Sequence, residues 1–110
     1  MKKIYKYNLR YYSEPEIVRL PMGADIIDFG IQNESVNMWA LVTPTAKEDK
    51  RVFVLVLTGQ DIPWRVIEHY GTKIIESTGI VVHLLELEKN TVALDPLKEN
   101  ELKENKRWQL

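Results

Sequence analysis

The sequence of 110 residues contains no cysteine, which excludes a disulfide framework, a thiolate nucleophile and a sulfur metal site. It has almost no net charge: 15 basic and 16 acidic residues leave −1 at pH 7, too little to attract nucleic acid or an anionic membrane. No apolar run approaches the roughly 18 residues of a membrane-spanning helix, and the opening MKKIYKYNLRYY lacks the apolar stretch of a signal peptide. We therefore expect a soluble intracellular protein.

Residues suited to metal or nucleotide chemistry are also scarce. The only histidines, His69 and His83, are far apart, and no carboxylate pattern lies between them, so we expect no metal site. The five glycines never approach the spacing of a dinucleotide-binding or Walker loop. The sequence therefore predicts neither a nucleotide site of those types nor any cofactor.

What the sequence does contain is a series of short segments with strand-like composition. They are separated by turn residues at intervals of roughly 8–12 residues, which is typical of an antiparallel sandwich or barrel. The segments are Lys3–Tyr11, Glu16–Leu20, Ala24–Gln32, Val36–Val42, Arg51–Gly59, Val66–Ile75 and Ile80–Leu87. We predict a mainly all-β fold of seven or eight strands, a small antiparallel β-sandwich or partly open barrel, within residues 1–88.

Residues 89–110 are predicted to form a charged C-terminal extension that is partly helical. Asp95 is suited to the N-cap of a short helix and Pro96 to its first position. The apolar residues of this segment do not form a continuous helical stripe.

Alternation of apolar and polar residues predicts which side chains point inward. The predicted core comprises Tyr5, Tyr7, Leu9, Val18, Leu20, Ile27, Phe29, Ile31, Phe53, Leu55, Val81 and Leu85. Asn33 is suited to a hairpin turn, because asparagine tolerates the left-handed backbone conformation. Gly71, inside a strand segment, predicts a bulge or a close approach of another group.

The segment RVFVLVLTG, residues 51–59, departs from alternation because both of its faces are apolar. If one face packs in the core, the other exposes a strip of valines to water, and each forfeits roughly 1.5–3 kcal/mol of burial. Val82 and Leu84, in the last strand segment, extend the expected patch. Exposed apolar patches mark interfaces, so we predict a homo-oligomer, most simply a two-fold dimer, with an interface comprising Val52, Val54, Val56, Val82 and Leu84.

Candidate catalytic groups are few, and each has a structural interpretation beside the functional one. His83 has two interpretations. It is suited to a general base that acts with Glu86 on nucleotides or glycans. It is also suited to a core-facing or interface histidine, which is favoured because no nucleophile motif accompanies it. TGQD, residues 58–61, is suited to presenting backbone N–H groups to an anion, but is more typical of a turn. Glu86 and Glu88 are better explained as solvated charges on an edge strand than as an acid–base pair.

The N-terminal strand interleaves basic residues with tyrosines, as proteins that bind single-stranded nucleic acid do. Alternation, however, places Tyr5 and Tyr7 opposite Lys6 and Arg10, so that stacking and charge do not cooperate. Core tyrosines on a strand protected by lysine explain the same pattern, and we do not expect nucleic acid as a partner.

Six short motifs occur in order: KKIYKYNL, IVRLPMGADIIDFGIQN, WALVTP, TGQDIP, YGT and GIVVHLLEL. Their order resembles a family of short, uncharacterised bacteriophage and prophage proteins, over residues 2 to about 88. The family pattern reads I-[YW]-K-[YF], L-P-x-G-A, W-A-x-V-x-P, T-G-x-x-[IL]-P, Y-x-G-T and V-x-H-[VL]-x-E. This chain departs from it at Asn33-Glu34-Ser35, where a glycine turn is usual, and at HYGT, where no residue separates tyrosine from glycine.

The resemblance implies a phage origin, an accessory role and the bacterial host cytoplasm as the location. The family has no assigned active site, so it implies no catalytic residue. We expect a non-enzymatic module that binds a host protein or a small host signal, in anti-defence or host takeover. The alternative is a structural or virion-associated protein, and an enzyme is the third hypothesis.

Overall fold

A computed structural model of the chain describes residues 1–91 and 107–109. Its elements are eight strands and one turn of 3-10 helix. They are β1 (Lys3–Leu9), β2 (Glu16–Pro21), β3 (Asp25–Gln32), β4 (Ser35–Val42), β5 (Glu48–Leu57), β6 (Val66–Ile75), β7 (Ile80–Leu87), η1 (Lys89–Thr91) and β8 (Arg107–Gln109).

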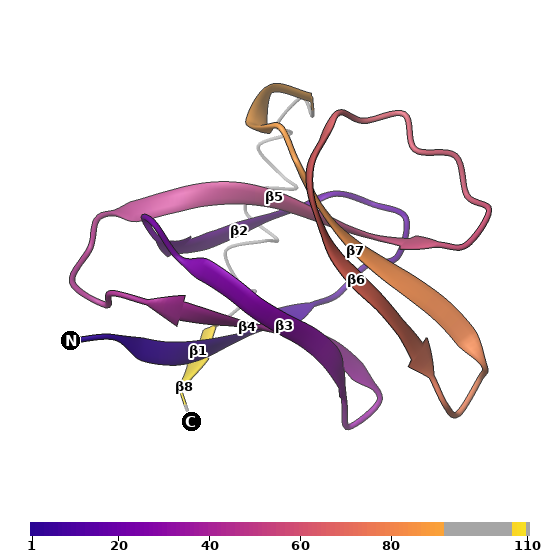
Figure 1. The fold of residues 1–110 in the computed structure, drawn as a ribbon, viewed down its shortest axis with the longest axis horizontal. Coiled ribbons are helices and arrows are strands. Elements are labelled where there is room, and N and C mark those ends of the chain that lie inside the picture. The colour runs from indigo at the N-terminus through magenta and orange to yellow at the C-terminus, as the bar shows by residue number, and fades with distance from the viewer. Residues whose placement is uncertain (92–106, 110) are drawn as a thin grey trace.

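The strands form two sheets that pack as a sandwich (Figure 1). One sheet has the order β3-β4-β1-β8 and the other the order β2-β5-β7-β6, and every neighbouring pair is antiparallel. The all-β antiparallel sandwich predicted from the sequence is confirmed. The predicted helix beginning at Asp95 and Pro96 lies outside the described residues, and β8, near the end of the extension, pairs with β1.

The main core lies between the two sheets, and most of the predicted core residues belong to it. Phe29 and Phe53, one from each sheet, are at most 1% exposed. Tyr5 and Tyr7 are buried there as well, whereas Tyr12, which follows the strand, is 45% exposed. The other predicted members found in this core are Leu9, Val18, Leu20 and Leu55, while Ile31 packs partly buried against it.

In β3 the predicted inward face is wrong at one residue. Ile26 is buried, whereas Ile27 is 49% exposed. The pairing of β3 with β4 shifts between Ile26 and Asp28, so an irregularity in the ladder interrupts simple alternation. Ile26 and Phe29 consequently share the inward face although they are three residues apart.

In β7 the predicted faces are inverted. Val82 and Leu84 were expected outside, but both are fully buried in the main core. Val81 is only partly buried, and Leu85 lies on the opposite face in a second apolar cluster. The inward face also carries Glu86, a residue that sequence patterning assigns to solvent; burial of its carboxylate in an ion pair explains the inversion.

The second cluster shows what covers the other face of β5. Val52, Val54 and Val56 pack with Ile17, Leu85 and Leu87 on the outer side of their sheet, and Tyr11 and Trp64 lie against them. These aromatic residues come from the β1–β2 and β5–β6 connections, which add a partial third layer. The three valines are 2–3% exposed. The argument for an interface at Val52, Val54, Val56, Val82 and Leu84 is therefore wrong, because none of them is exposed in the protomer.

Two local predictions are confirmed. Asn33 and Glu34, at the β3–β4 turn, have φ of 53° and 64°, the left-handed pair required by a type I′ hairpin. Gly71 lies in a bulge of β6 with φ of 121°, and a Cβ at this position would lie 3.7 Å from the Phe29 ring. The contact would be an ordinary one, so it is the positive φ of the bulge that favours glycine at this position.

Truncation of either core phenylalanine should remove much of the stability. Phe29→Ala and Phe53→Ala should each lower the free energy of unfolding by about 3–5 kcal/mol, because each leaves a cavity between the sheets. Ile27→Ala, on the exposed side of β3, should cost less than about 1 kcal/mol. Urea unfolding monitored by circular dichroism measures all three, and equal effects of Ile27 and Phe29 would contradict the assigned faces.

A charge in the second cluster should unfold the protomer. Val54→Glu would place a carboxylate at a position that is 2% exposed, without a partner among the cluster's apolar residues. The cost is expected to be several kcal/mol. Leu57→Glu, on the same strand at a 36% exposed position, is the control. Thermal unfolding of both variants tests this; a folded Val54→Glu protomer with an unchanged melting temperature would contradict it.

Candidate functional site

His83 lies on the outer face of β7 between two threonine hydroxyl groups. Its Nε2 is 2.8 Å from Oγ1 of Thr58, and its Nδ1 is 2.8 Å from Oγ1 of Thr72. Thr72 is the cross-strand partner of His83 on β6, whereas Thr58 comes from the turn after β5. The His69 ring lies nearby, with its centroid 6.2 Å from that of His83. The two histidines that are distant in sequence are thus neighbours.

A groove of about 420 Å³ lies beside this group, between the 58–65 connection and the outer faces of β6 and β7. Its polar side chains are Thr58, Gln60, His69 and His83. Its apolar lining consists of Val56, Leu57, Ile62, Val66 and Leu85. The described residues that line it include no aspartate, glutamate, lysine or arginine. The groove is therefore an apolar-walled hollow with a hydrogen-bonding end and no fixed charge.

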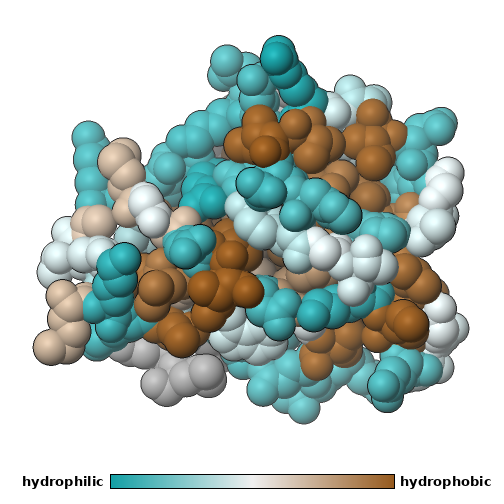
Figure 2. Space-filling model, viewed as in Figure 1, coloured by the Kyte–Doolittle hydropathy of each residue, from teal (hydrophilic) through white to brown (hydrophobic). Residues whose placement is uncertain are grey.

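Exposed hydrophobic side chains gather beside the groove. Ile62, Val66 and Ile67 are 40–53% exposed. Figure 2 shows hydrophobic residues in the upper part of the view, the region where the 58–65 connection meets β6. This surface differs from the patch expected on β5 and β7, and alternation gave no signal for it because two of the three residues border irregular backbone.

The connection that forms the groove wall is anchored at both ends. At its start, Gln60 Oε1 accepts hydrogen bonds from Leu57 N, at 3.1 Å, and from Ser13 Oγ, at 2.7 Å. At its end, Arg65 O accepts a hydrogen bond from Glu88 N, at 3.0 Å. Between these anchors Trp64 packs on the second cluster. TGQD thus begins as a turn, as favoured from the sequence, and its Thr58, Gly59 and Gln60 also line the groove.

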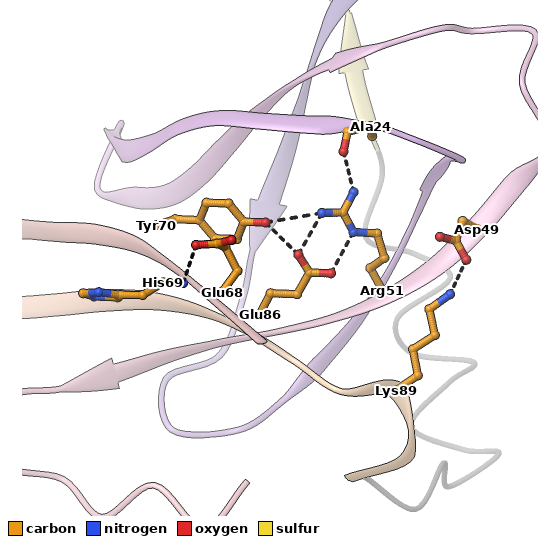
Figure 3. A network of polar contacts seen from close by, with 8 residues as sticks. All are labelled: Ala24, Asp49, Arg51, Glu68, His69, Tyr70, Glu86 and Lys89. Atoms are coloured by element: carbon orange, nitrogen blue, oxygen red, sulfur yellow. Dashed lines mark hydrogen bonds and ion pairs between the residues drawn. The ribbon is translucent and has the colours of Figure 1, made fainter. Parts of the chain in front are cut away.

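Glu86 does not join His83, because it lies on the opposite face of β7, inside the sandwich. Figure 3 shows Glu86 among Arg51 and Tyr70 instead. Arg51 donates to both of its carboxylate oxygens, through Nε at 2.8 Å and Nη2 at 2.7 Å. Tyr70 Oη donates to Glu86 at 2.7 Å, and Arg51 Nη1 donates to Ala24 O at 2.5 Å. The interpretation of Glu86 as a solvated edge charge is wrong: it is 5% exposed on an interior strand.

The electrostatics of this network favour a structural role. The hydrogen bond to Glu86 raises the pKa of Arg51, so the guanidinium stays charged. Burial and the neighbouring Glu86 carboxylate raise the pKa of Tyr70, so the phenol keeps its proton. Arg51 also lies over the Phe53 ring, 5.6 Å from its centroid. The network joins β5, β6, β7 and the β2–β3 connection.

Glu16, at the start of β2, is a second buried carboxyl group. It is 2% exposed, and its Oε1 accepts hydrogen bonds from the backbone N–H groups of Arg10 and Tyr11, both at 2.7 Å. Burial raises the pKa of Glu16 to about 7, against the lowering effect of these hydrogen bonds. Glu16 therefore shapes the β1–β2 connection and titrates near neutral pH.

Other features of the described residues give weaker candidates. A hollow of about 580 Å³ between the β3–β4 and β6–β7 hairpins is lined by Glu34, Lys73 and Glu76, but Lys73 already pairs with Asp28 at 3.1 Å. Within residues 1–91, no three histidine or acidic side chains lie close enough together to hold a metal ion. No helix in the described part of the chain has the length and hydrophobicity to cross a bilayer.

The fold and the groove define a small all-β sandwich protein with an apolar-walled hollow on the outer face of a sheet. The chain belongs to the family described as domain of unknown function DUF7352, whose model matches residues 1–94. The match confirms membership of an uncharacterised family and extends slightly beyond the boundary predicted at residue 88. No curated protein and no solved structure matches the chain.

The raised pKa of Glu16 predicts a pH-dependent stability. Because the folded-state pKa, about 7, exceeds the ordinary 4.5, the folded chain binds the proton more tightly, and stability from this group is lost as pH rises from 4.5 to 7. At roughly 1.4 kcal/mol per pKa unit, the loss is about 3 kcal/mol.

Glu16→Gln keeps an oxygen acceptor for the two N–H groups and removes the ionisation. The variant should gain stability relative to the natural chain between pH 4.5 and 7, measured by urea unfolding at a series of pH values. Glu76→Gln, an exposed carboxyl in the β6–β7 turn, is the matched control. Parallel pH profiles for natural chain and Glu16→Gln would contradict the assignment.

Proposed function

We propose that this protein is a non-enzymatic binding module whose ligand occupies the groove beside His83. The observation that carries the proposal is the groove itself: apolar walls for contact area and a few hydrogen-bonding groups gathered at one end, the usual composition of a ligand site. The exposed Ile67, next to the lining residues Ile62 and Val66, extends the apolar contact for a larger partner.

The contacts of His83 support binding more than catalysis. Both of its ring nitrogens are hydrogen-bonded to threonine hydroxyls, which neither accept a proton nor carry charge near neutral pH. Glu86, the carboxylate considered as its catalytic partner, binds Arg51 on the other face of the strand. Glu86 therefore does not orient His83 as a carboxylate orients a catalytic histidine.

The narrower form of the proposal comes from the resemblance of the sequence to phage and prophage proteins. In that form the chain is a phage accessory protein of the bacterial host cytoplasm, and its ligand is a host protein or a small host signal. The predicted homo-oligomer stays a prediction, and it needs a surface other than the buried valines of β5.

The test is to fill the groove and compare what the protein retains. The tagged natural chain and Val66→Trp are incubated with bacterial lysate, washed and denatured, and the released compounds and proteins are identified by mass spectrometry. Val66 is 40% exposed at the groove, so a larger side chain should occupy the hollow without disturbing the core. Ile74→Trp, 60% exposed at the other end of β6, is the matched control.

We expect at least one species to be retained by the natural chain and by Ile74→Trp but lost with Val66→Trp. Equal retention by all three proteins, or no retained species at all, would overturn the groove as the binding site. Circular dichroism of both variants verifies that the fold is preserved.

A further inference from the structure

The hydrogen-bonding end of the groove contains a side-chain amide whose orientation is fixed. Gln60 receives the backbone N–H of Leu57, a group that can only donate, so the atom facing Leu57 must be the amide oxygen. Ser13 Oγ donates to the same oxygen. The acceptor of Gln60 is therefore occupied, and its Nε2 donors have no hydrogen-bond partner among the described residues. Gln60 offers donors.

Thr58 can offer a donor as well, because His83 links its hydroxyl group to that of Thr72 through a relay of two hydrogen bonds. In the neutral ring one nitrogen donates and the other accepts. When Nε2 carries the proton it donates to Thr58 Oγ1, and Thr72 donates to Nδ1. The hydroxyl hydrogen of Thr58 is then free for a ligand. A ligand that accepts a hydrogen bond selects this tautomer, and Thr72 acts as a positioning residue at the other end of the relay.

The remaining chemistry of the groove limits the charge of its ligand. The described lining residues carry no fixed charge, and the walls beside Thr58 are aliphatic. A carboxylate or phosphate would lose water there without gaining a permanent cation, which is unfavourable. The lining includes Thr58 and Gln60, which offer donors to an uncharged carbonyl oxygen, and Val56, Val66 and Leu85, which offer contact to an attached apolar group.

We propose that the groove binds uncharged acyl compounds, in which an amide or ester carbonyl is joined to a small apolar group. Thr58 Oγ and Gln60 Nε2 donate to the carbonyl oxygen, and the aliphatic walls hold the apolar group. The proposal rests on the groove being the binding site and specifies what that site recognises.

The probe is N-acetyl-L-leucine methylamide, which has uncharged carbonyl groups and an isobutyl side chain. It is titrated into the 15N-labelled full chain and followed by amide chemical shifts. For a compound of this size we expect a dissociation constant on the order of 1 mM, with saturable shifts at residues 57–60 and at His83.

Two probes serve as comparisons: N-acetyl-L-leucine, which has a carboxylate, and N-acetylglycine methylamide, which lacks the apolar group. Both should bind at least about fivefold more weakly.

Four variants separate the donors from the fold. Thr58→Val keeps the shape and removes the hydroxyl, and Gln60→Glu keeps an acceptor for Leu57 but replaces the donors. Each should weaken binding about tenfold, the usual effect of losing one hydrogen bond. Thr58→Ser should bind within about twofold of the natural chain. Thr45→Val, in the connection at the opposite end of β5, should leave binding unchanged.

The His83 relay has its own spectroscopic readout. Long-range 1H–15N correlations of the imidazole should show the fraction of the Nε2–H tautomer rising as the probe saturates the groove. In Thr72→Val, binding should persist while the free-state tautomer ratio shifts, as expected for a positioning residue.

The proposal is overturned if the methylamide causes no saturable shifts, if the carboxylate probe binds as tightly, or if Thr58→Val and Gln60→Glu both bind like the natural chain. These failures are distinguishable from failure of the proposed function. If the probes fail but Val66→Trp still abolishes retention of a lysate species, the groove is a binding site for a different chemistry. If the probes fail and no retained species depends on Val66, the groove is not a binding site.

Discussion

The buried ion pair between Arg51 and Glu86 determines which faces of β5 and β7 point inward. Glu86 is paired across the ladder with Phe53, so Arg51, two residues away on β5, reaches it diagonally on the same face. Two charges inside a small sandwich are costly unless they satisfy each other, and removing one would leave the other unpaired. The pair therefore favours one register strongly. Tyr70 and the carbonyl of Ala24 complete its hydrogen bonds and extend the constraint to β6 and to the chain preceding β3.

The functional candidates are consequences of that register. With Glu86 inside, the odd-numbered residues of β7 point outward, which places His83 beside Thr72 and Leu85 beside the valines of β5. An outward apolar face then needs a cover, and the connections carrying Tyr11 and Trp64 supply it. The cover is partial. Where the 58–65 connection leaves the sheet, the groove opens with His83 at its polar end.

Sequence patterns were sufficient for the strands, the sandwich class and the inward phenylalanines, because those features depend on local alternation and turn chemistry. Sequence patterns failed where a partner distant in sequence buries a residue that alternation assigns to the surface. Glu86 has the pattern of a surface residue until Arg51 is known to face it, and this single inversion produced the wrong expectation that Val82 and Leu84 are exposed. The groove was not predictable for the same reason: Thr58 and His83 are 25 residues apart, and only the folding of the connection over the sheet joins them. The doubly apolar β5 segment was the one available signal that something covers this face.

The groove also depends on a residue that does not line it. Glu16 holds the backbone of Arg10 and Tyr11, and two residues further on Ser13 adopts a left-handed conformation with φ of 63°. That conformation costs energy for a residue other than glycine, and it is maintained by the bonds from Ser13 N to Leu55 O and from Ser13 Oγ to Gln60. The latter bond helps fix the amide that presents donors to the groove. A buried carboxyl group that titrates near neutral pH is thus linked, through one short connection, to the polar end of the candidate site. The same connection covers the valines of β5, so stability of the second cluster and order of the groove depend on one set of contacts.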